Sequence, residues 1–320
     1  MGILEKVRRH AAVASGNFAH MFKDVKKIPP FPAAAARLIS EINSPEPNIN
    51  KLVKVISSAP GISAKVIKTI NSSLFQLRNP VTNVQHAVTL LGLRHIRKIA
   101  FAYTVVDALP EPKGELFDHE AFWTDSLVMA MLAREFASIT LKGQENEAFT
   151  ASLLADIAIP VLLSSWQEYY EPVIKEWKTS PERLSEIERR HFGWDHSQAG
   201  AWIAQSWGFP DEMVCYIGSH NLSWVQIREE GLEDTVIVPM IVAATKSSVL
   251  KSDIKRLSKV VENAYSCLSI NAFQFAEIVE GIKASFEEVR QLLSLSNRNA
   301  TKTFDDLITS AESLTGENQT

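Results

Sequence analysis

Apolar residues recur at spacings of three and four along most of the chain, a pattern typical of helices with one buried face. No segment alternates apolar and polar residues convincingly over the length of a strand. The pattern predicts helices over residues 3–22, 33–43, 49–58, 64–72, 84–91, from 94 onward, 118–139, 146–165, 181–191, 199–207, 210–219, 236–250, 253–268, 271–297 and 301–314. The sequence therefore predicts an all-α protein.

Proline, glycine and capping residues divide these helices. Ser63 is predicted to cap the helix of residues 64–72, and Thr82-Asn83-Val84-Gln85 has the spacing of a capping box. Asp195, followed by Gln198, is a second predicted cap. Gly92 and Gly193 are predicted to end helices, because glycine adopts positive φ at little cost.

The same punctuation divides the chain into four parts. Residues 1–24 form an amphipathic helical arm, and residues 25–110 form a small N-terminal helical bundle. A larger helical bundle follows over residues 115–250, and residues 251–320 form a helical extension. The boundary between the two bundles falls at Glu111-Pro112-Lys113-Gly114, where proline and glycine disfavour a helix.

Charge changes sign at that boundary. The net charge is −4, but residues 1–106 hold 15 Lys and Arg against four Asp and Glu, so they carry +11 and the remainder carries −15. No acidic residue lies between Glu46 and Asp107. Such a division indicates either an anionic partner for the basic half or two halves that neutralise each other. Both interpretations stay open at this point.

Composition is that of a soluble globular protein, with 46% hydrophobic and 22% charged residues. No apolar run is expected to reach the roughly 20 residues of a membrane span, and residues 1–13 lack a signal-peptide core. A cytoplasmic location is therefore predicted. Cys215 and Cys267 lie far apart without a Cys-x-x-Cys pattern, and are expected to be free thiols.

One carboxylate, Asp156, interrupts the apolar run of residues 147–160. An ionised carboxylate buried without partners costs several kcal/mol, so it must be paired, hydrogen-bonded, protonated or bound to a cation. Pro160 is expected to disturb the helix here, because its missing donor would face Asp156 one turn earlier.

Eight short segments, spread over roughly residues 25–222, occur in a recognisable order. They are IPPFP (28–32), APGIS (59–63), INSSLF (70–75), VQHAVTLLGL (84–93), FWTDS (122–126), SLLADI (152–157), GWDHSQAG (193–200) and WGFP (207–210). Together they resemble the HDOD domain, a non-enzymatic bacterial signalling relative of the HD phosphohydrolases. This chain has Ala59-Pro60 where that family usually has Asp-Pro. The resemblance implies an HD-like helical bundle preceded by a smaller one.

The resemblance also implies where a metal site would lie. HD hydrolases use a first His, a His-Asp pair and a later Asp, with further His residues in some branches. These positions fall in turn on Asp125, Ala155, Asp156, Thr245, His196 and His220. Alanine offers no ligand atom, whereas hydrolysis of a phosphodiester by this route needs a cation held by several ligands. The prediction is therefore no catalytic residue, no metal and no cofactor.

The surviving polar groups leave two interpretations open. Asp125, Asp156, His196 and His220 could converge on a divalent ion, since carboxylates and imidazoles are suitable ligands. Alternatively, Asp156 pairs with a neighbouring side chain in a pocket that is only structural. The first interpretation makes the protein a divergent metal-dependent phosphohydrolase, and the second a binding module.

Five cations in the basic half are candidate contacts for phosphates or an acidic partner: Lys65, Lys68, Arg94, Arg97 and Lys98. Nucleic acid is not expected, because no helix-turn-helix signature is evident. The predicted function is a non-catalytic output or scaffold module that binds a signalling protein or an anionic small molecule such as a nucleotide. The resemblance further implies two-component and cyclic-dinucleotide signalling networks.

Overall fold

The computed structural model describes residues 30–42, 49–73, 75, 77, 79–113, 116–245, 254–292, 295 and 300–317. Over these residues every regular element is a helix, and no strand is present. The predicted all-α class is confirmed. The predicted arm of residues 3–22 lies outside the described residues, as does the end of the helix predicted over 236–250.

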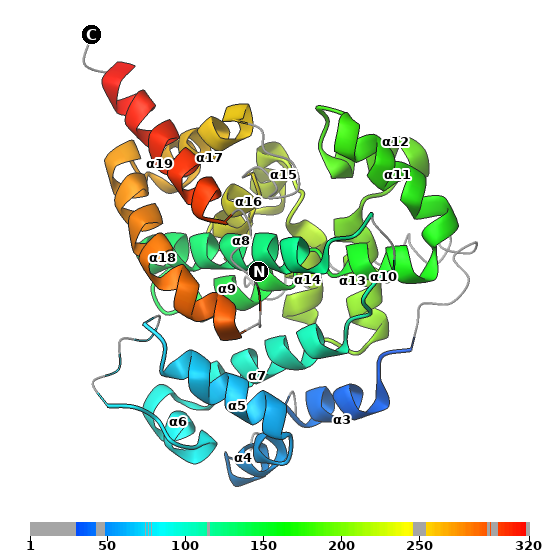
Figure 1. Cartoon of the computed structure of the whole chain (residues 1–320), viewed down its shortest axis with the longest axis vertical. Coiled ribbons are helices and arrows are strands. Elements are labelled where there is room, and N and C mark those ends of the chain that lie inside the picture. Colours follow the sequence, from blue (N-terminus) through cyan, green and yellow to red (C-terminus); the bar gives the residue numbers. More distant parts are fainter. Residues whose placement is uncertain are drawn as a thin grey trace.

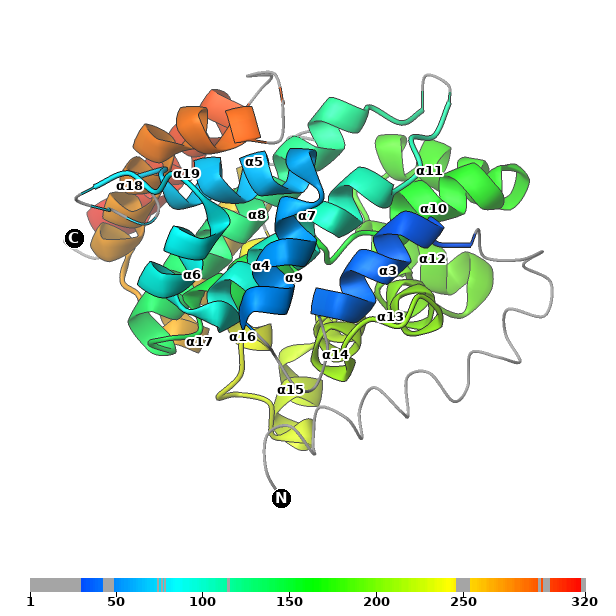
Figure 2. The ribbon, with the colours of Figure 1, turned by 90° about the horizontal axis from the view of Figure 1, so that it is seen from below.

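The N-terminal helices form one layer at the bottom of the molecule (Figure 1), and Figure 2 shows this layer face on. Helix α7 lies against most of the others, because Ile96, Ala100 and Tyr103 recur at helical spacing and are all buried. The layer consists of α3 (Ala33–Ile42), α4 (Ile49–Ser57), α5 (Pro60–Ile70), α6 (Val84–Leu91) and α7 (Leu93–Ala108).

Helix α8 (His119–Thr140) crosses the middle of the molecule. Its residues from Ala121 to Ala133 are all buried, so it is surrounded on every side rather than amphipathic. It packs against α9 (Glu145–Leu153) and α16 (Ile237–Ala244). This central position makes α8 a rigid wall against which the candidate site is built.

A second group of helices follows α9. These are α10 (Ala158–Ser165), α11 (Gln167–Thr179), α12 (Leu184–Phe192), α13 (His196–Ser206), α14 (Asp211–Ser219) and α15 (Trp224–Glu230). Helices α10 to α13 share a separate core that is rich in aromatic residues. Within it, the rings of Phe192 and Trp194 stack at 4.8 Å. This core fixes the turn between α12 and α13.

The last three helices are α17 (Ile254–Leu268), α18 (Ala272–Leu292) and α19 (Ala300–Glu317). Helix α18 contacts both α8 and α5. One continuous hydrophobic core therefore runs from Ile39 in the N-terminal layer to Ala311 in α19. This core crosses the predicted domain boundaries near residues 110 and 250. The division of the chain into four parts therefore stays a prediction.

Two predicted caps are wrong. Ser63 lies inside α5, which begins at Pro60 after Ala59, and Ala59 has no capping side chain. The cap of α6 is Asn83, not Thr82: the Asn83 side chain accepts a hydrogen bond from His86 N at 2.8 Å. Gly92 has the expected positive φ of 83°, but its ψ of 155° lies outside the left-handed helical region.

Two helices were not predicted, α11 and α15. Helix α11 contains Pro172, and its charged surface residues obscure the buried positions Tyr170, Val173 and Ile174. Helix α15 is only seven residues long. Conversely, the single helix predicted over residues 146–165 is two helices, α9 and α10, separated by a turn at Leu154–Ile157.

That segment also corrects a second expectation. Among the described residues, the stretch Glu145–Ser165 is long and apolar enough to cross a membrane by length and composition, so the expectation of no such run is wrong. Of its most apolar window, 72% is buried inside the protein. An apolar helix pair in the core of a folded protein passes the same test.

Candidate functional site

Asp156 lies in the turn between α9 and α10. The turn forms because Pro160 cannot donate to the Asp156 carbonyl, which instead accepts a hydrogen bond from Ile159 N at 3.0 Å. The Asp156 side chain, 19% exposed, points away from the apolar helix faces toward α13 and α14. The disturbance predicted at Pro160 thus frees the carboxylate from a regular helix.

His196 is the first residue of α13, and its position is set by a capping box. The Asp195 side chain accepts hydrogen bonds from Ser197 N and Gln198 N, at 2.9 and 3.2 Å. In return, the Gln198 side chain accepts one from Asp195 N at 3.1 Å. The predicted cap at Asp195 is confirmed, and so is the helix end at Gly193, which has φ of 77°.

His220 follows the last residue of α14. Its Nδ1 donates a hydrogen bond to the Ile217 carbonyl at 2.7 Å, which turns Nε2 toward Asp156. The ring is 3% exposed. The end of α14 therefore holds an imidazole in one orientation through its own backbone.

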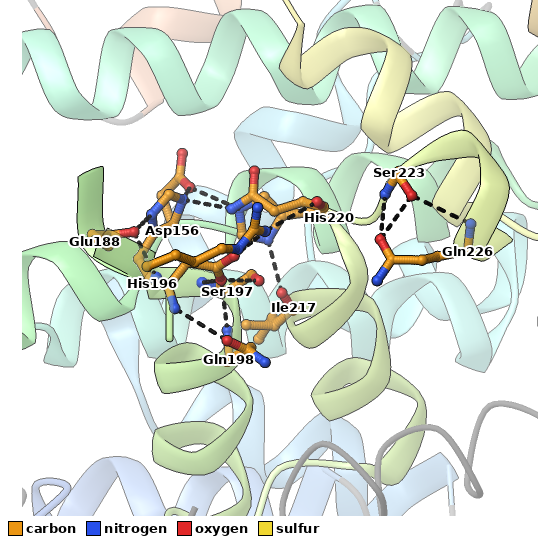
Figure 3. Close-up of polar contacts among 12 residues, drawn as sticks. Asp156, Glu188, His196, Ser197, Gln198, Ile217, His220, Ser223 and Gln226 are labelled. Carbon is orange, nitrogen blue, oxygen red and sulfur yellow. Dashed lines mark hydrogen bonds and ion pairs between the residues drawn. The ribbon is translucent and has the colours of Figure 1, made fainter. Parts of the chain in front are cut away.

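These three residues converge on one point (Figure 3). Oδ1 of Asp156 lies 3.3 Å from Nε2 of His196 and 3.1 Å from Nε2 of His220. The carboxamide Nδ2 of Asn221 lies 3.0 Å from the first of these nitrogens and 3.3 Å from the second. Among the described residues, Asp156, His196 and His220 form a set whose ligand atoms lie within 4.8 Å of one another.

A buried acid behind His196 was not identified from the sequence. Glu188, on α12, is fully buried, and its Oε2 accepts hydrogen bonds from His196 Nδ1 at 2.6 Å and His196 N at 2.8 Å. The Tyr170 hydroxyl donates to the other oxygen. Helical spacing puts Glu188 on the same face as the apolar Leu184, four residues earlier, but that spacing does not indicate its contact with His196.

The charged forms of Asp156 and His196 stabilise each other. Burial alone would raise the pKa of Asp156, but hydrogen bonds from His196 and His220 outweigh it and hold that pKa well below its usual range. Burial would lower the pKa of His196, but Glu188 and Asp156 raise it well above its ordinary value. The network therefore favours a positive charge between the carboxylates of Asp156 and Glu188.

A cavity of about 140 Å³ opens onto the network. Asp125 on α8 lines it together with Asp156, His196, His220 and Asn221, so the structure brings these residues to one place. The rest of the wall is mostly apolar: Leu116, Phe117, Phe122, Met129, Ile159, Leu163, Ile174, Trp177 and Leu184.

The other two expected positions contribute no polar group to that cavity. Ala155 is 3% exposed and has no ligand atom. Thr245 follows α16, and its hydroxyl donates to the Val242 carbonyl; the neighbouring Ala244 lines the cavity. The pocket therefore has two carboxylates and two imidazoles in its wall, and neither Ala155 nor Thr245 is among its lining residues.

The basic residues occur in two places. Arg94 and Lys98 on α7 both pair with Glu147, at 3.0 and 2.5 Å, and Arg97 lines the same groove between α7 and α14. Lys65 pairs instead with Asp107, near the end of α7. Asp107 lies 13 residues after Arg94, which is about 20 Å along the helix axis. Lys68, one turn after Lys65 on α5, is exposed.

These pairs bear on the division of charge along the chain. Glu147 is 5% exposed and also accepts a hydrogen bond from the Tyr216 hydroxyl at 3.1 Å. An acid of the second half thus neutralises two cations of the first. For Arg94 and Lys98 the two halves do complement each other, and Arg94 is still 68% exposed at the surface.

Solved structures share this architecture. An HDOD domain protein of unknown function from Geobacter sulfurreducens has a TM-score of 0.63, with 20% identity over 89% of this chain and 98% of that one. A proposed phosphohydrolase from Shewanella amazonensis SB2B has 0.61, with 21% identity over 90% and 97%. A proposed signal transduction protein from Marinobacter aquaeolei VT8 has 0.57, with 20% identity over 96% and 66%. At these identities the likeness shows the fold.

The fold and the pocket define an all-α protein of the HD-like class. Within that class the chain belongs to the HDOD domain family, whose family model matches residues 28–222. An uncharacterized protein of Treponema pallidum (strain Nichols) is 20% identical over 202 residues, which is 62% of this chain. The match spans only 38% of that relative's length.

On the correspondence expected from the resemblance, the metal centre of HD hydrolases does not fit these residues. The first His position falls on Asp125, the His-Asp pair on Ala155-Asp156, and the late Asp on Thr245, whose hydroxyl is hydrogen-bonded to its own helix. Only one of the four defining positions, Asp156, then keeps its residue type, and Ala155 offers no ligand atom. No step of an HD-type hydrolysis follows from this donor set.

Proposed function

We propose that the protein is a non-catalytic signal-transduction module of the HDOD type that binds a protein partner. The observation that supports this most directly is the buried alanine at position 155, where a hydrolase of the HD class needs a ligand. Family membership points the same way, since the HDOD domain is a signalling module. In this proposal the partner belongs to a two-component or cyclic-dinucleotide network in the cytoplasm.

The binding surface in this proposal is the groove between α7 and α14. It has a volume of about 460 Å³ and is lined by residues of α7, in the N-terminal layer, and of α14, in the second group of helices. Leu93, Phe101 and Met213 give it an apolar floor. Arg94, Arg97 and Lys98 line it together with two acids, Glu212 and Glu147, and Glu147 pairs with Arg94 and Lys98. An acidic, partly apolar segment of a partner would match this surface, because arginine binds carboxylates in a bidentate manner.

Paired variants test the groove. Arg94→Glu with Arg97→Glu reverses two charges in the groove, and Lys65→Glu with Lys68→Glu makes the same change on α5. Each protein is immobilised and incubated with lysate of the host bacterium, and retained proteins and nucleotides are identified by mass spectrometry. We expect a protein retained by the wild type and the α5 variant but not by the groove variant.

Two other outcomes would contradict the proposed groove or the proposed protein partner. Identical retention by all three proteins would overturn the groove, and selective loss of a nucleotide would replace the protein partner with a small anionic ligand. Far-UV circular dichroism controls for folding. Loss of binding in both double variants together would indicate a general charge effect.

The rival function is a divergent metal-dependent phosphohydrolase, favoured by the convergence of Asp156, His196 and His220. Bis(p-nitrophenyl) phosphate with added Mn²⁺ distinguishes the two. We expect no turnover above the rate of the Asp156→Ala variant. Turnover that Asp156→Ala abolishes would establish the enzyme and overturn the non-catalytic proposal.

A further inference from the structure

Lys98 on α7 is a partly buried amine that borders the groove between α7 and α14. Its side chain is 19% exposed, and its Nζ lies 2.5 Å from Oε2 of Glu147. Burial lowers the pKa of Lys98 and outweighs the ion pair with Glu147, which raises that pKa. Lys98 is therefore neutral for a larger fraction of the time than a lysine with the ordinary pKa, and the neutral amine is the form that attacks an electrophile.

Two guanidinium groups lie on the same side of α7 as this amine. Residues three and four positions apart share a helix face, and Arg94 precedes Arg97 by three positions and Lys98 by four. All three side chains line the groove. Arg94 is 68% exposed, so it stays accessible to a ligand while it pairs with Glu147. Because guanidinium groups bind phosphate oxygens through two N–H donors at once, the groove combines a nucleophile with a binding place for a phosphate.

Glu147 is placed to accept a proton from the amine. Its Oε2 lies 2.5 Å from Nζ of Lys98 and 3.0 Å from Nη2 of Arg94. Its Oε1 accepts a hydrogen bond from the Tyr216 hydroxyl at 3.1 Å. These contacts hold the carboxylate beside the amine, within the distance that a general base needs.

The rest of the groove suits a short apolar chain. Phe101, Pro210 and Met213 line it, and its volume of about 460 Å³ is typical of small-molecule sites. A ligand with a phosphate at one end and a small apolar group at the other matches both parts of this surface. Acyl phosphates have this structure, and the carbonyl carbon between the two ends is an electrophile.

We propose that Lys98 is a modification site, acylated by a small acyl phosphate that binds in the α7–α14 groove. Arg94 and Arg97 bind the phosphate, and Phe101 and Met213 contact the acyl chain. Lys98 supplies the nucleophile in a reaction that needs no other protein. The modification is independent of a protein partner; only its effect on partner binding rests on the proposed function of the groove.

The reaction balances with these groups. The ammonium of Lys98 passes one proton to Glu147 and on to water, and the neutral Nζ attacks the carbonyl carbon to form a C–N bond. The bond between that carbon and the phosphate oxygen breaks, and its electron pair leaves with the phosphate. The second proton lost by the nitrogen goes to the phosphate, which departs as hydrogen phosphate. Arg94 and Arg97 stabilise the negative charge of this leaving group.

The product changes the charge of the groove. An amide has no positive charge, so Glu147 loses its ion pair with Lys98 and keeps its contacts with Arg94 and Tyr216. The groove then has one cation fewer. An acyl phosphate thus sets the charge of the surface on which an acidic segment would bind.

The test uses the purified full chain with acetyl phosphate, and mass spectrometry after digestion measures the acetylation rate of each lysine. Exposed Lys68 on α5 is the internal reference. We expect Lys98 to react about 10-fold faster than Lys68, because binding raises the effective concentration of the reagent at the amine. The rate at Lys98 should saturate with acetyl phosphate and fall with added inorganic phosphate. Acetic anhydride, which has no phosphate, should instead modify Lys68 faster than Lys98.

Matched variants separate phosphate binding from the reactivity of the amine. Arg97→Gln should slow acetylation of Lys98 by acetyl phosphate about 10-fold and leave the rate at Lys68 unchanged. Arg37→Gln is the control, because Arg37 on α3 lines a different groove, and it should react like the wild type. Far-UV circular dichroism shows that each variant is folded.

Three results would overturn the proposal. They are a Lys98 that reacts no faster than Lys68, a rate at Lys98 that rises linearly with acetyl phosphate, and equal rates at Lys98 in the wild type and Arg97→Gln. All are measured without a partner, so they leave the proposed protein partner to its own test. Conversely, a failure to retain any partner would leave saturable acetylation of Lys98 standing.

Discussion

Gly200 lies directly against Ile217: a Cβ atom added at Gly200 would be 2.7 Å from Cγ2 of Ile217. Helices α13 and α14 thus approach each other more closely than a larger residue at position 200 would permit. His196 begins α13 and His220 follows α14, so this close approach sets the distance between the two imidazoles.

Gly200→Ala should therefore destabilise the protein by about 1 to 3 kcal/mol, the usual cost of overpacking a core. The free energy of unfolding is measured by urea denaturation. Adding Ile217→Ala removes the atom in the way, so the double variant should lose less than the two single variants together. Gly281→Ala is the control: a Cβ there meets nothing within 4 Å, and alanine in α18 should stabilise by up to about 1 kcal/mol.

Glu147→Ala should lower the free energy of unfolding by more than Arg94→Ala, which removes the exposed partner of Glu147. It leaves Lys98, 19% exposed, without its acceptor, and breaking a buried ion pair costs about 3 to 5 kcal/mol. Arg94→Ala removes a side chain that is 68% exposed, and should cost at most about 1 kcal/mol. Similar losses for the two variants in urea denaturation would show that Lys98 does not depend on Glu147.

Tyr103 should make stability sensitive to alkaline pH. Burial raises the pKa of Tyr103 to about 12 from 10.0, and its hydroxyl is hydrogen-bonded to Thr69. A pKa raised by folding gives stability that is complete below pH 10 and is lost as pH rises through 12. About 2 to 3 kcal/mol should be lost across this interval. Tyr103→Phe should lack this part of the pH dependence, as measured by urea midpoints from pH 9 to 12.

Glu188→Ala should destabilise the protein strongly, by about 3 to 5 kcal/mol, because it leaves His196 and the Tyr170 hydroxyl buried without their acceptor. Tyr170→Phe removes only one donor and should cost about 1 kcal/mol. A thermal or urea transition measures both. A Glu188→Ala protein as stable as Tyr170→Phe would contradict the role of Glu188 as the anchor of His196.

The helical class and most helix positions follow from apolar spacing, because buried residues repeat at helical spacing in helices such as α5 and α18. Glycine and capping signals located Asp195 and Gly193 correctly. They failed at Ser63 and Thr82, because a cap depends on the backbone angles of a single residue: Asn83 is extended, with φ of −154°, and caps α6 itself. Helix α11 was missed because Pro172 and a charged surface hide its apolar face.

The site was predictable only in part. Burial of a lone carboxylate in an apolar run singled out Asp156, and the resemblance placed His196 and His220 near it. The role of Glu188 was not predictable, because it sits in a charged helix where one acid among several turns inward. Which of several charges is buried depends on the packing of α10, α11 and α13 around it, and that packing is not local in sequence.

The single core that extends from Ile39 to Ala311 has a consequence for how this chain could be shortened or recombined. The ring of Phe275 on α18 packs 6.0 Å from Phe136 on α8, and Glu288 on the same helix accepts a hydrogen bond from Ser73 N. A chain cut after residue 245 would leave Phe136 facing water. The last helices are therefore not an interchangeable tail, and the described helices should melt in one cooperative transition.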